Sequence, residues 1–414
     1  MDITTFDTAT HEELGLMVGF PPPPDKRVDR SNGLWMAPHN RWAYQHMRRL
    51  LPSAGWPASD DIVRLKRRID PHLDRIDVTR EDGTKADFET FLRETFTDSL
   101  VVVQGGDVVF ERYMNSMKPT TPHQMMSCTK SFVGLFAQMA IGRGQVGESD
   151  RVGDLVSELG APSMGAFSEA TFGQVLDMTN SMAFNEDYVD PAADIHTYVS
   201  VVGLGPAVDG GAPTVYDYLT TLAPDPQVGH GEVFHYQTPK TDAASWVTCR
   251  VTGRSLLDDL HQLWSAIGAD GEAYMLLDSA GMPVAGGGLN ATAEDLARFG
   301  WMMANDGEIG GRSVVEPRII DTLLAGGSTE AFLAGPDAVG CFGTGEWSYR
   351  SKWWVRHTPG REAICAIGVN GQWIYCDPAR RMAIVKQSSQ PLAADPVFYD
   401  YEMNAFDAIA DAVA

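Results

Sequence analysis

Stretches that favour β-strands lie towards both ends of this 414-residue chain and thin out in its middle. In the segment 98–114, DSLVVVQGGDVVFERYM, two valine-rich runs flank Gly105–Gly106, which predicts a β-hairpin. Between 352 and 389, four more runs favour consecutive strands joined by short turns: KWWVRH, REAICAIGVN, GQWIYCDP and RRMAIVKQSS. From about 145 to 280 the pattern favours short helices instead. This order predicts an α+β fold, an antiparallel sheet built from both ends of the chain with a helical domain inserted between them.

Helices are predicted on either side of the sheet-forming runs. Residues 39–52 form a candidate helix that ends at a proline, and 397–412 form an amphipathic one that closes the chain. A further helix is predicted over 290–305, where Thr292 and Asp295 have the spacing of a capping box. Terminal helices of this kind are expected to cover the sheet.

The same patterns divide the chain into three parts. We expect an extended N-terminal arm at 1–27 that contains the run PPPP, an α/β sheet domain made of 28–144 and 281–414, and an inserted, mostly helical domain at 145–280. A cleft between the sheet and the helical domain is the expected place for a small-molecule site.

Composition narrows the range of partners and locations. The net charge of −23 argues against nucleic acid or an anionic membrane as a partner. The acidic N-terminus MDITTFDTATHEELG lacks the pattern of a signal peptide, and no run of 18 apolar residues is present. Five cysteines without framework spacing favour reduced thiols and a cytoplasmic protein. We expect a small-molecule substrate and no metal or organic cofactor, and the sequence leaves a homodimer open.

Ser127 stands three residues before Lys130 in HQMMSCTKSFVGLFAQMA, residues 123–140. The apolar period predicts a buried helix that ends near Gly142. Residues three apart share a helix face, so the Lys130 ammonium can reach the Ser127 hydroxyl, and free N–H groups at the first turn favour negative charge. The spacing alone allows two readings: a lysine-paired nucleophile, or a helix-capping serine beside a solvent-directed lysine.

Two tyrosines lie in segments with unusual local composition. GEVFHYQTPKTDAASW at 231–246 places Tyr236 just before a helix that starts with Thr-Pro. FNEDYVDPAADI at 184–195 places Tyr188 among acids in a proline-ended loop. Each also has an ordinary structural reading, as an interface tyrosine or as part of a solvated acidic turn.

Taken together, these segments resemble the serine β-lactamase and penicillin-recognising superfamily. Within it, the chain is most similar to the 6-aminohexanoate-oligomer (nylon dimer) hydrolase group and its carboxylesterase relatives. The resemblance covers nearly the whole chain and rests on six strings: APHNRWAY (37–44), MSCTKS (126–131), FNEDYVDPA (184–192), FHYQTPKTD (234–242), LARFGWMM (296–303) and IGVNGQWIYCDP (367–378). It favours the catalytic reading of Ser127 and Lys130.

The resemblance implies roles for individual residues. Ser127 becomes the nucleophile, and Lys130 and Tyr236 become its proton-handling partners. The backbone N–H groups of Val369 and Ser127 form the oxyanion hole, and Tyr188 matches a tyrosine that favours amide cleavage. We further assign Glu186 and Asn370 to substrate binding. Glu186 is expected to attract a substrate ammonium group.

Two departures from the family pattern affect the expected substrate. The string AIGV at 366–369 stands where β-lactamases carry Lys-Thr-Gly, which normally helps to hold the carboxylate of the antibiotic. Gly286, in VAGGG, stands where the nylon-oligomer hydrolases tend to carry Asn. Strong β-lactam hydrolysis is therefore not expected.

The expected activity is hydrolysis of short linear amides or esters through an acyl-enzyme on Ser127. A serine hydroxyl needs an adjacent base. Either Lys130 loses its charge and acts as the base, or it stays charged and Tyr236 acts as a phenolate; the sequence leaves both open. The alternatives are a D-stereospecific peptidase or β-lactamase-like enzyme, and a non-catalytic ligand-binding member of the superfamily.

Overall fold

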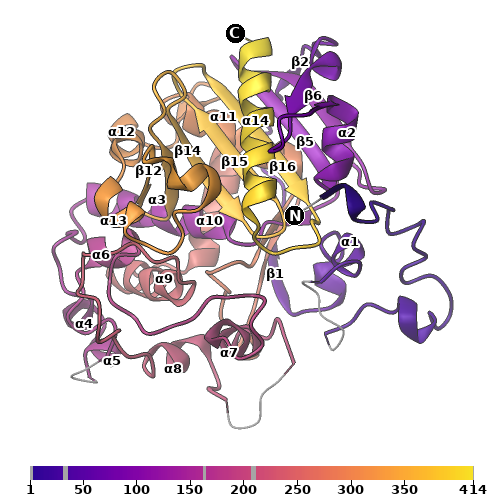
Figure 1. Ribbon diagram of the computed structural model, residues 1–414. Coiled ribbons are helices and arrows are strands. Elements are labelled where there is room, and N and C mark those ends of the chain that lie inside the picture. Colours follow the sequence, from indigo (N-terminus) through magenta and orange to yellow (C-terminus); the bar gives the residue numbers. More distant parts are fainter. Residues whose placement is uncertain (1–2, 31–35, 162–164, 207–210, 414) are drawn as a thin grey trace.

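A computed structural model describes residues 3–30, 36–161, 165–206 and 211–413 of the chain. Its largest element is an eight-stranded sheet with the order β12-β13-β14-β15-β16-β5-β6-β2 (Figure 1). Neighbouring strands are antiparallel, except that β2 runs parallel to β6. The strands are β2 Lys66–Arg67, β5 Thr97–Gln104, β6 Asp107–Tyr113, β12 Trp347–Arg350, β13 Trp353–Arg356, β14 Ala363–Gly368, β15 Gln372–Asp377 and β16 Met382–Ser388.

The two ends of the chain meet in the centre of this sheet. Strand β16 pairs with β5, with Val385 opposite Val101. The hairpin predicted at 98–114 and the four strands predicted between 352 and 389 are confirmed. The edge strand β12 is present in the structure but is not predicted from the sequence.

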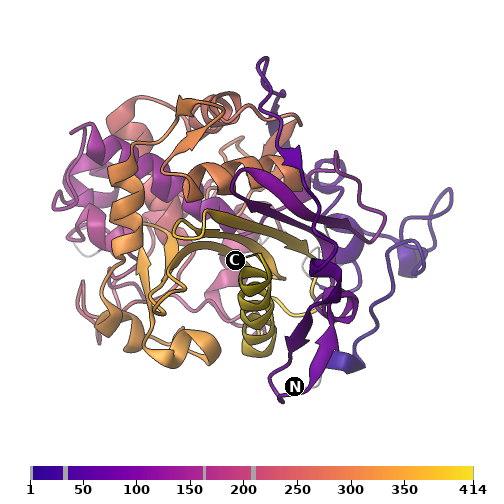
Figure 2. The same ribbon diagram turned by 90° about the horizontal axis from the view of Figure 1, so that it is seen from above.

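The central strands are buried on both faces, because helices cover each side of the sheet. In β14, Ile364 and Ala366 belong to one hydrophobic core and Cys365 and Ile367 to the other, as the two-residue period of a strand requires. The first core contains α3 (Cys128–Gly142) and α11 (Ala293–Ala304), and the second contains α2 (Phe88–Glu94) and α14 (Pro396–Ala412). Figure 2 shows α14 on one side of the sheet and the helices of the middle region on the other.

The middle of the chain is helical, as the sequence predicts. The helices are α4 Val152–Leu155, α5 Ser157–Gly160, α6 Phe172–Leu176, α7 Asp194–Val201, α8 Val215–Leu219, α9 Pro239–Thr252 and α10 Leu256–Ala266. Helix α9 packs against α3, so this region adjoins the segment that carries Ser127. The division into domains stays a prediction.

A second, four-stranded sheet has the order β1-β8-β9-β7. Its strands are β1 Ser53–Trp56, β7 His123–Gln124, β8 Ala273–Leu276 and β9 Leu289–Ala291. Strands this short show too little periodicity to be predicted from sequence. Strand β8 falls inside the region 145–280, which was expected to be mostly helical, and β7 leads directly into the turn before Ser127.

Two predicted helix features are wrong in detail. Residues 39–52 form only the short helix α1 (Asn40–Ala43) and the 3-10 turn η3 (Met47–Arg49). Nδ1 of the His46 ring lies 2.7 Å from the carbonyl oxygen of Trp42. This contact uses the carbonyl that would accept the backbone N–H of residue 46 if the helix continued.

The second concerns the capping box of α11. Thr292 accepts from the N–H of Asp295 at 3.1 Å, but the Asp295 carboxylate accepts from the N–H groups of Asp270 and Gly271 and from the Thr292 hydroxyl. Only half of the predicted capping box therefore forms.

The remaining elements are short and lie at the periphery. They are η1 Ile3–Thr5, η2 Pro24–Lys26, η4 Leu73–Arg75, β3 Asp77–Thr79, β4 Lys85–Asp87, β10 Glu308–Ile309, β11 Arg312–Ser313, α12 Pro317–Ala325, α13 Thr329–Leu333 and η5 Gly340–Thr344. Across the described ranges, no helix has both the length and the apolar character needed to cross a membrane.

Candidate active site

Ser127 lies at the N-terminus of α3, directly after Met126. The φ angle of Met126 is 46°, in the left-handed region, which costs a non-glycine residue about 1–3 kcal/mol. The burial of Met126, which is 2% exposed, shows that packing holds this turn in place. Ser127 makes no side-chain capping bond to the helix, so its hydroxyl is available to the pocket in front of it.

Lys130 lies one turn further along the same helix and is almost fully buried. Its Nζ is 2.7 Å from Oγ of Ser127 and donates to the carbonyl oxygen of Gly286 at 2.6 Å. Burial lowers the pKa of Lys130 to about 8, although the carboxylates of Glu186 and Asp242 oppose this effect. The reading as a solvent-directed lysine beside a capping serine is therefore wrong.

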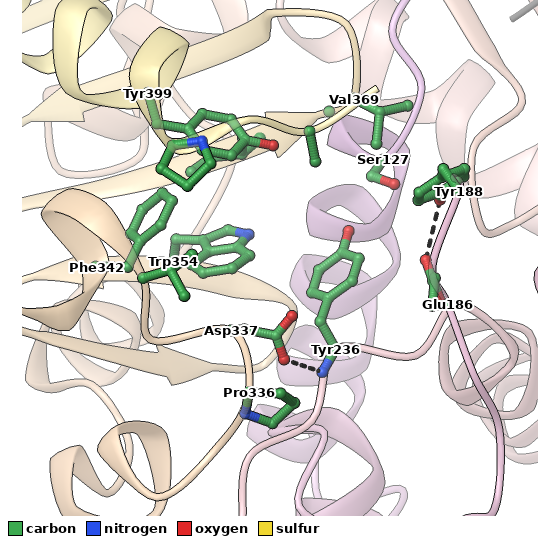
Figure 3. A pocket seen from close by; sticks show the side chains of 15 residues that line it. Ser127, Glu186, Tyr188, Tyr236, Pro336, Asp337, Phe342, Trp354, Val369 and Tyr399 are labelled. Atoms are coloured by element: carbon green, nitrogen blue, oxygen red, sulfur yellow. Dashed lines mark hydrogen bonds between the residues drawn. The ribbon is translucent and has the colours of Figure 1, made fainter. Parts of the chain in front are cut away.

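Tyr236 approaches Ser127 from the other side, on the loop that leads into α9. Its backbone N–H donates to Oδ2 of Asp337 at 2.8 Å. The ring stacks on Trp354 with centroids 5.5 Å apart, and Nζ of Lys130 lies 5.0 Å from the ring centroid. Burial raises the pKa of Tyr236 well above its usual value. Figure 3 shows the phenol directed at Ser127.

Val369 follows the end of β14 and shares the pocket with Ser127. A Cβ on Gly368 would lie 2.6 Å from the carbonyl oxygen of Met125, so only glycine lets β14 approach the chain before Ser127 this closely. Within the described part of the chain, the backbone N–H groups of Ser127 and Val369 donate to no protein acceptor. Two unused donors in one pocket suit a substrate oxygen that gains negative charge.

A loop fastened to the start of α9 carries Glu186 and Tyr188. Gln237 donates to the carbonyl oxygen of Phe184 at 2.7 Å, and Thr238 donates to Glu186 from its N–H at 2.5 Å and from its hydroxyl at 2.6 Å. The Tyr188 hydroxyl donates to Glu186 at 3.1 Å. Both Glu186 and Tyr188 line the pocket, and burial raises the pKa of each.

A buried carboxyl group, Asp242, lies behind Lys130. It accepts from the Tyr198 hydroxyl at 2.8 Å, while its Oδ1 has no hydrogen-bond partner among the described residues. Burial raises the pKa of Asp242 to about 7.

The pocket in front of Ser127 has a volume of about 200 Å³ and an aromatic wall. We call it the aromatic pocket; its wall consists of Tyr236, Phe342, Trp354 and Tyr399. Phe342 contacts Trp354 with ring centroids 4.7 Å apart and Tyr399 with centroids 5.3 Å apart. The Asp337 carboxylate lies beside this wall (Figure 3). Burial raises the pKa of Asp337 to about 7.

Asn370 does not contact the pocket. Its side chain is fully buried, accepts from the Tyr44 hydroxyl at 2.8 Å and donates to the carbonyl oxygen of Gln390 at 2.8 Å. Its φ of 61° places it in the left-handed region that asparagine tolerates. The assignment of Asn370 to substrate binding is therefore corrected to a structural role, holding the turn after Val369.

Several pocket residues escape the sequence analysis. Asp337 stands in AGPDAVG, which has the composition of an ordinary turn, and the wall residues Phe342, Trp354 and Tyr399 come from three separate elements. Asp242 could have been found from the sequence, because it lies four residues after Thr238 and positions i and i+4 share one face of a helix. Across the described ranges, no group of three or more His, Cys, Asp or Glu side chains is arranged to hold a metal ion.

Comparison with known proteins agrees with this fold and site. The chain belongs to the beta-lactamase family, which it matches over residues 87–405. It is a serine hydrolase of the amidase and esterase type. Within the family it is 36% identical to the 6-aminohexanoate-dimer hydrolase of Paenarthrobacter ureafaciens over 359 residues, which cover 86% of each chain.

Solved structures support the same placement. A Bacillus anthracis protein, provisionally assigned as a 6-aminohexanoate-dimer hydrolase, is 28% identical with a TM-score of 0.83, covering 95% of this chain and 99% of that one. A family VIII carboxylesterase shares the fold at 16% identity, with a TM-score of 0.53 over 77% of this chain and 97% of that one. The predicted α+β, β-lactamase-like fold is confirmed.

Proposed function

We propose that the protein hydrolyses short linear amides and esters through a covalent acyl-enzyme on Ser127. The observation that carries this proposal is the 2.7 Å contact between the Ser127 hydroxyl and the buried Nζ of Lys130 at a helix N-terminus. Similarity to a protein named 6-aminohexanoate-dimer hydrolase supports an amide bond between linear alkyl units as one substrate.

Lys130 rather than Tyr236 is the base in this proposal. A lysine whose pKa is about 8 is partly neutral near pH 7, so its lone pair can accept the serine proton. Burial instead keeps Tyr236 protonated by raising its pKa well above the usual value. A protonated phenol is suited to donate a proton, not to take one.

The reaction then follows from these positions. Lys130 takes the proton of the Ser127 hydroxyl as Oγ forms a bond to the substrate carbonyl carbon, and the oxyanion is held by the N–H groups of Ser127 and Val369. The bond to the leaving nitrogen or oxygen breaks as Tyr236 gives it a proton, and Lys130 returns a proton to Tyr236. Water then attacks the ester by the reverse of these transfers and releases the acid.

Hydrolysis of β-lactam antibiotics is less well supported. The carboxylate of such a substrate needs a cationic partner, and the described lining of the aromatic pocket has no lysine or arginine. The string AIGV in place of Lys-Thr-Gly supports the same conclusion.

The test is hydrolysis of short p-nitrophenyl esters by the purified protein and by its Ser127→Ala variant. We expect the variant to lose at least about a thousandfold in kcat/KM, since loss of a paired nucleophile costs far more than a binding contact. Intact mass should show a phosphonate adduct on the wild type alone. If the variant keeps more than about a hundredth of the activity, Ser127 is not the nucleophile.

One finer expectation concerns the location of the protein. The cytoplasmic location stays a prediction. It rests on the acidic N-terminus and on five cysteines whose spacing favours reduced thiols. Fractionation of the native host, with antibody detection of the protein, would test it.

A further inference from the structure

Two pockets of different character meet at Ser127. The aromatic pocket is one of them, and a smaller cavity of about 30 Å³ lies on the other side. We call the second the aliphatic pocket; it is lined by Met126, Ser127, Tyr188, Ile195, Tyr198, Val199, Leu204, Thr238, Val284, Gly286, Gly287 and Val369. Ser127, Tyr188 and Val369 line both pockets. A scissile bond held at Ser127 therefore has one substituent in each.

The position of Tyr236 indicates which pocket holds the leaving group and which holds the acyl chain. The group that protonates the leaving atom must lie on the leaving-group side of the scissile bond. Tyr236 lines the aromatic pocket and is not part of the aliphatic pocket. The leaving group therefore occupies the aromatic pocket, and the acyl chain occupies the aliphatic pocket.

The aromatic pocket has the chemistry of a cation site. It contains two carboxyl groups, Asp337 and Glu186, and the ring faces of its aromatic wall. The described lining has no lysine or arginine. Lys130 lies behind the Tyr236 ring, and Nζ of Lys240 is fully buried and donates to two carbonyl oxygens. Carboxylates combined with aromatic faces attract ammonium groups and repel carboxylates.

The aliphatic pocket has the opposite chemistry. Its two side-chain hydroxyls besides those of Ser127 and Tyr188 are already engaged: Tyr198 donates to Asp242, and Thr238 donates to Glu186. A side chain cannot be added at Gly286 without displacement, because a Cβ there would lie 2.4 Å from Thr238 and 2.6 Å from the Tyr198 hydroxyl. Burying an ammonium group in such surroundings is costly. A volume of about 30 Å³ holds two or three water-sized groups, which suits a short chain.

From this asymmetry we infer a substrate class: amides and esters that join a short, uncharged acyl chain to an amine or alcohol bearing a cationic ammonium group. The inference rests on the proposed acyl-enzyme function. It also implies that a leaving group bearing a carboxylate is a poor fit for the aromatic pocket, so this chain differs from a hydrolase of the 6-aminohexanoate dimer in the charge that each half of the substrate carries.

The test compares three butyrate esters that differ in leaving-group charge. They are the ester of choline, the ester of 3,3-dimethylbutanol, which replaces the quaternary nitrogen by carbon at the same shape, and the ester of glycolate. We expect kcat/KM to be at least about tenfold higher for the choline ester than for its neutral isostere, and lowest for the glycolate ester. Equal rates for the choline ester and its isostere, or a preference for the glycolate ester, would overturn the inference.

Variants assign the effect to the pocket. Asp337→Asn keeps an acceptor for the N–H of Tyr236 but removes the charge, and we expect it to reduce the choline-to-isostere ratio at least about threefold. Tyr399→Leu, which removes a ring on a different element, should reduce the ratio as well. Glu330→Gln removes an exposed acid outside the pocket and should leave the ratio unchanged. A ratio that neither pocket variant lowers would also overturn the inference.

A second pair of esters tests whether the aliphatic pocket prefers an uncharged acyl chain. Pentanoyl and 4-aminobutyryl esters of one neutral alcohol differ in whether the chain ends in a methyl or an ammonium group. We expect the pentanoyl ester to be preferred at least about tenfold, and the reverse order would overturn the acyl assignment.

Failure of the proposed function looks different from failure of this inference. If Ser127 is required for hydrolysis of the neutral ester and the choline ester is not preferred, only the inference fails. If no ester is hydrolysed in a manner that depends on Ser127, the proposed function fails, and the inference fails with it.

Discussion

The floor and the walls of the active site are built in different ways. The floor consists of the first turn of α3 and the end of β14, and its residues Ser127, Lys130 and Gly368 are all buried in a packed core. Besides the aromatic wall, whose Trp354 and Tyr399 come from β13 and α14, two loops border the site. These loops, 184–192 and 334–345, carry Glu186 and Asp337 with partial exposure, and we call them the walls. Regular elements position the floor, whereas hydrogen bonds such as those from Thr238 position the walls.

This difference separates chemistry from selectivity. Bond cleavage needs atoms held closely, and packed elements provide that precision. Loops tolerate substitution, so a change in a wall alters which substrate fits without removing the reaction. Floor variants should therefore affect every substrate, and wall variants should affect some substrates more than others.

The largest effect is expected from Gly368→Ala on the floor. The added Cβ would lie 2.6 Å from the Met125 carbonyl oxygen and would push Val369 away from Ser127. We expect kcat to fall about 100-fold for amides and esters alike, as for loss of one oxyanion donor, together with a lower Tm. Gly142→Ala, at the other end of α3, is the control, because its Cβ meets nothing closer than 3.4 Å. Wild-type rates in the Gly368 variant would contradict this reading of the floor.

The pH dependence of the reaction tests the floor by another route. In the proposed mechanism neutral Lys130 is the active form, and burial sets its pKa to about 8 against the charges of Glu186 and Asp242. Lys352 also lies close by, but burial lowers its pKa well below the usual value. We expect kcat/KM to rise about tenfold between pH 7 and pH 9, because deprotonation produces the base. The measurement is a pH–rate profile with a substrate that does not titrate in this range.

Asp242→Asn provides the control for that profile. The carboxylate of Asp242 is ionised above about pH 7 and raises the pKa of Lys130, so its removal should move the rising limb to lower pH. A rate that keeps rising beyond pH 10 would instead identify Tyr236 as the base, since its pKa is raised far above the usual value.

Tyr188→Phe tests the walls. An amide nitrogen leaves poorly until it is protonated or held by a hydrogen bond, and the Tyr188 hydroxyl is placed to hold it. We expect amide turnover to fall at least about tenfold, or roughly 1.4 kcal/mol, while ester turnover changes little. The measurement compares an amide and an ester of the same acyl group. Equal losses on both substrates would make Tyr188 part of the general scaffold.

The smallest effect is expected from thiol reagents. Cys128 directly follows Ser127, the proposed nucleophile, but it is fully buried, and its thiol donates to the Ala366 carbonyl oxygen at 3.4 Å. Burial also raises the pKa of this thiol well above its usual value. N-ethylmaleimide should therefore change activity by less than about twofold. Rapid inactivation that substrate prevents, and that Cys128→Ala abolishes, would contradict this geometry.

Sequence reasoning is most successful for the floor. Helical spacing allows Ser127 to contact Lys130, and the resemblance favours that pairing. The strand that ends just before Val369 follows from a local run of β-favouring residues. Asp337 and Trp354 meet Tyr236 only through long-range packing, which no local pattern records. The error at Asn370 has the same origin, since its partners Tyr44 and Gln390 are remote in sequence.

The pairing of β16 with β5 in the middle of the sheet has a consequence for how the protein matures. The two proposed oxyanion donors, Ser127 and Val369, belong to opposite halves of the chain, so neither half can build the proposed catalytic pocket by itself. Contacts between such distant segments form late in folding, after a large loop has been closed. Hydrolytic activity is therefore a stringent marker of complete folding. In a refolding experiment it should return with the slowest phase, after helical structure has already appeared.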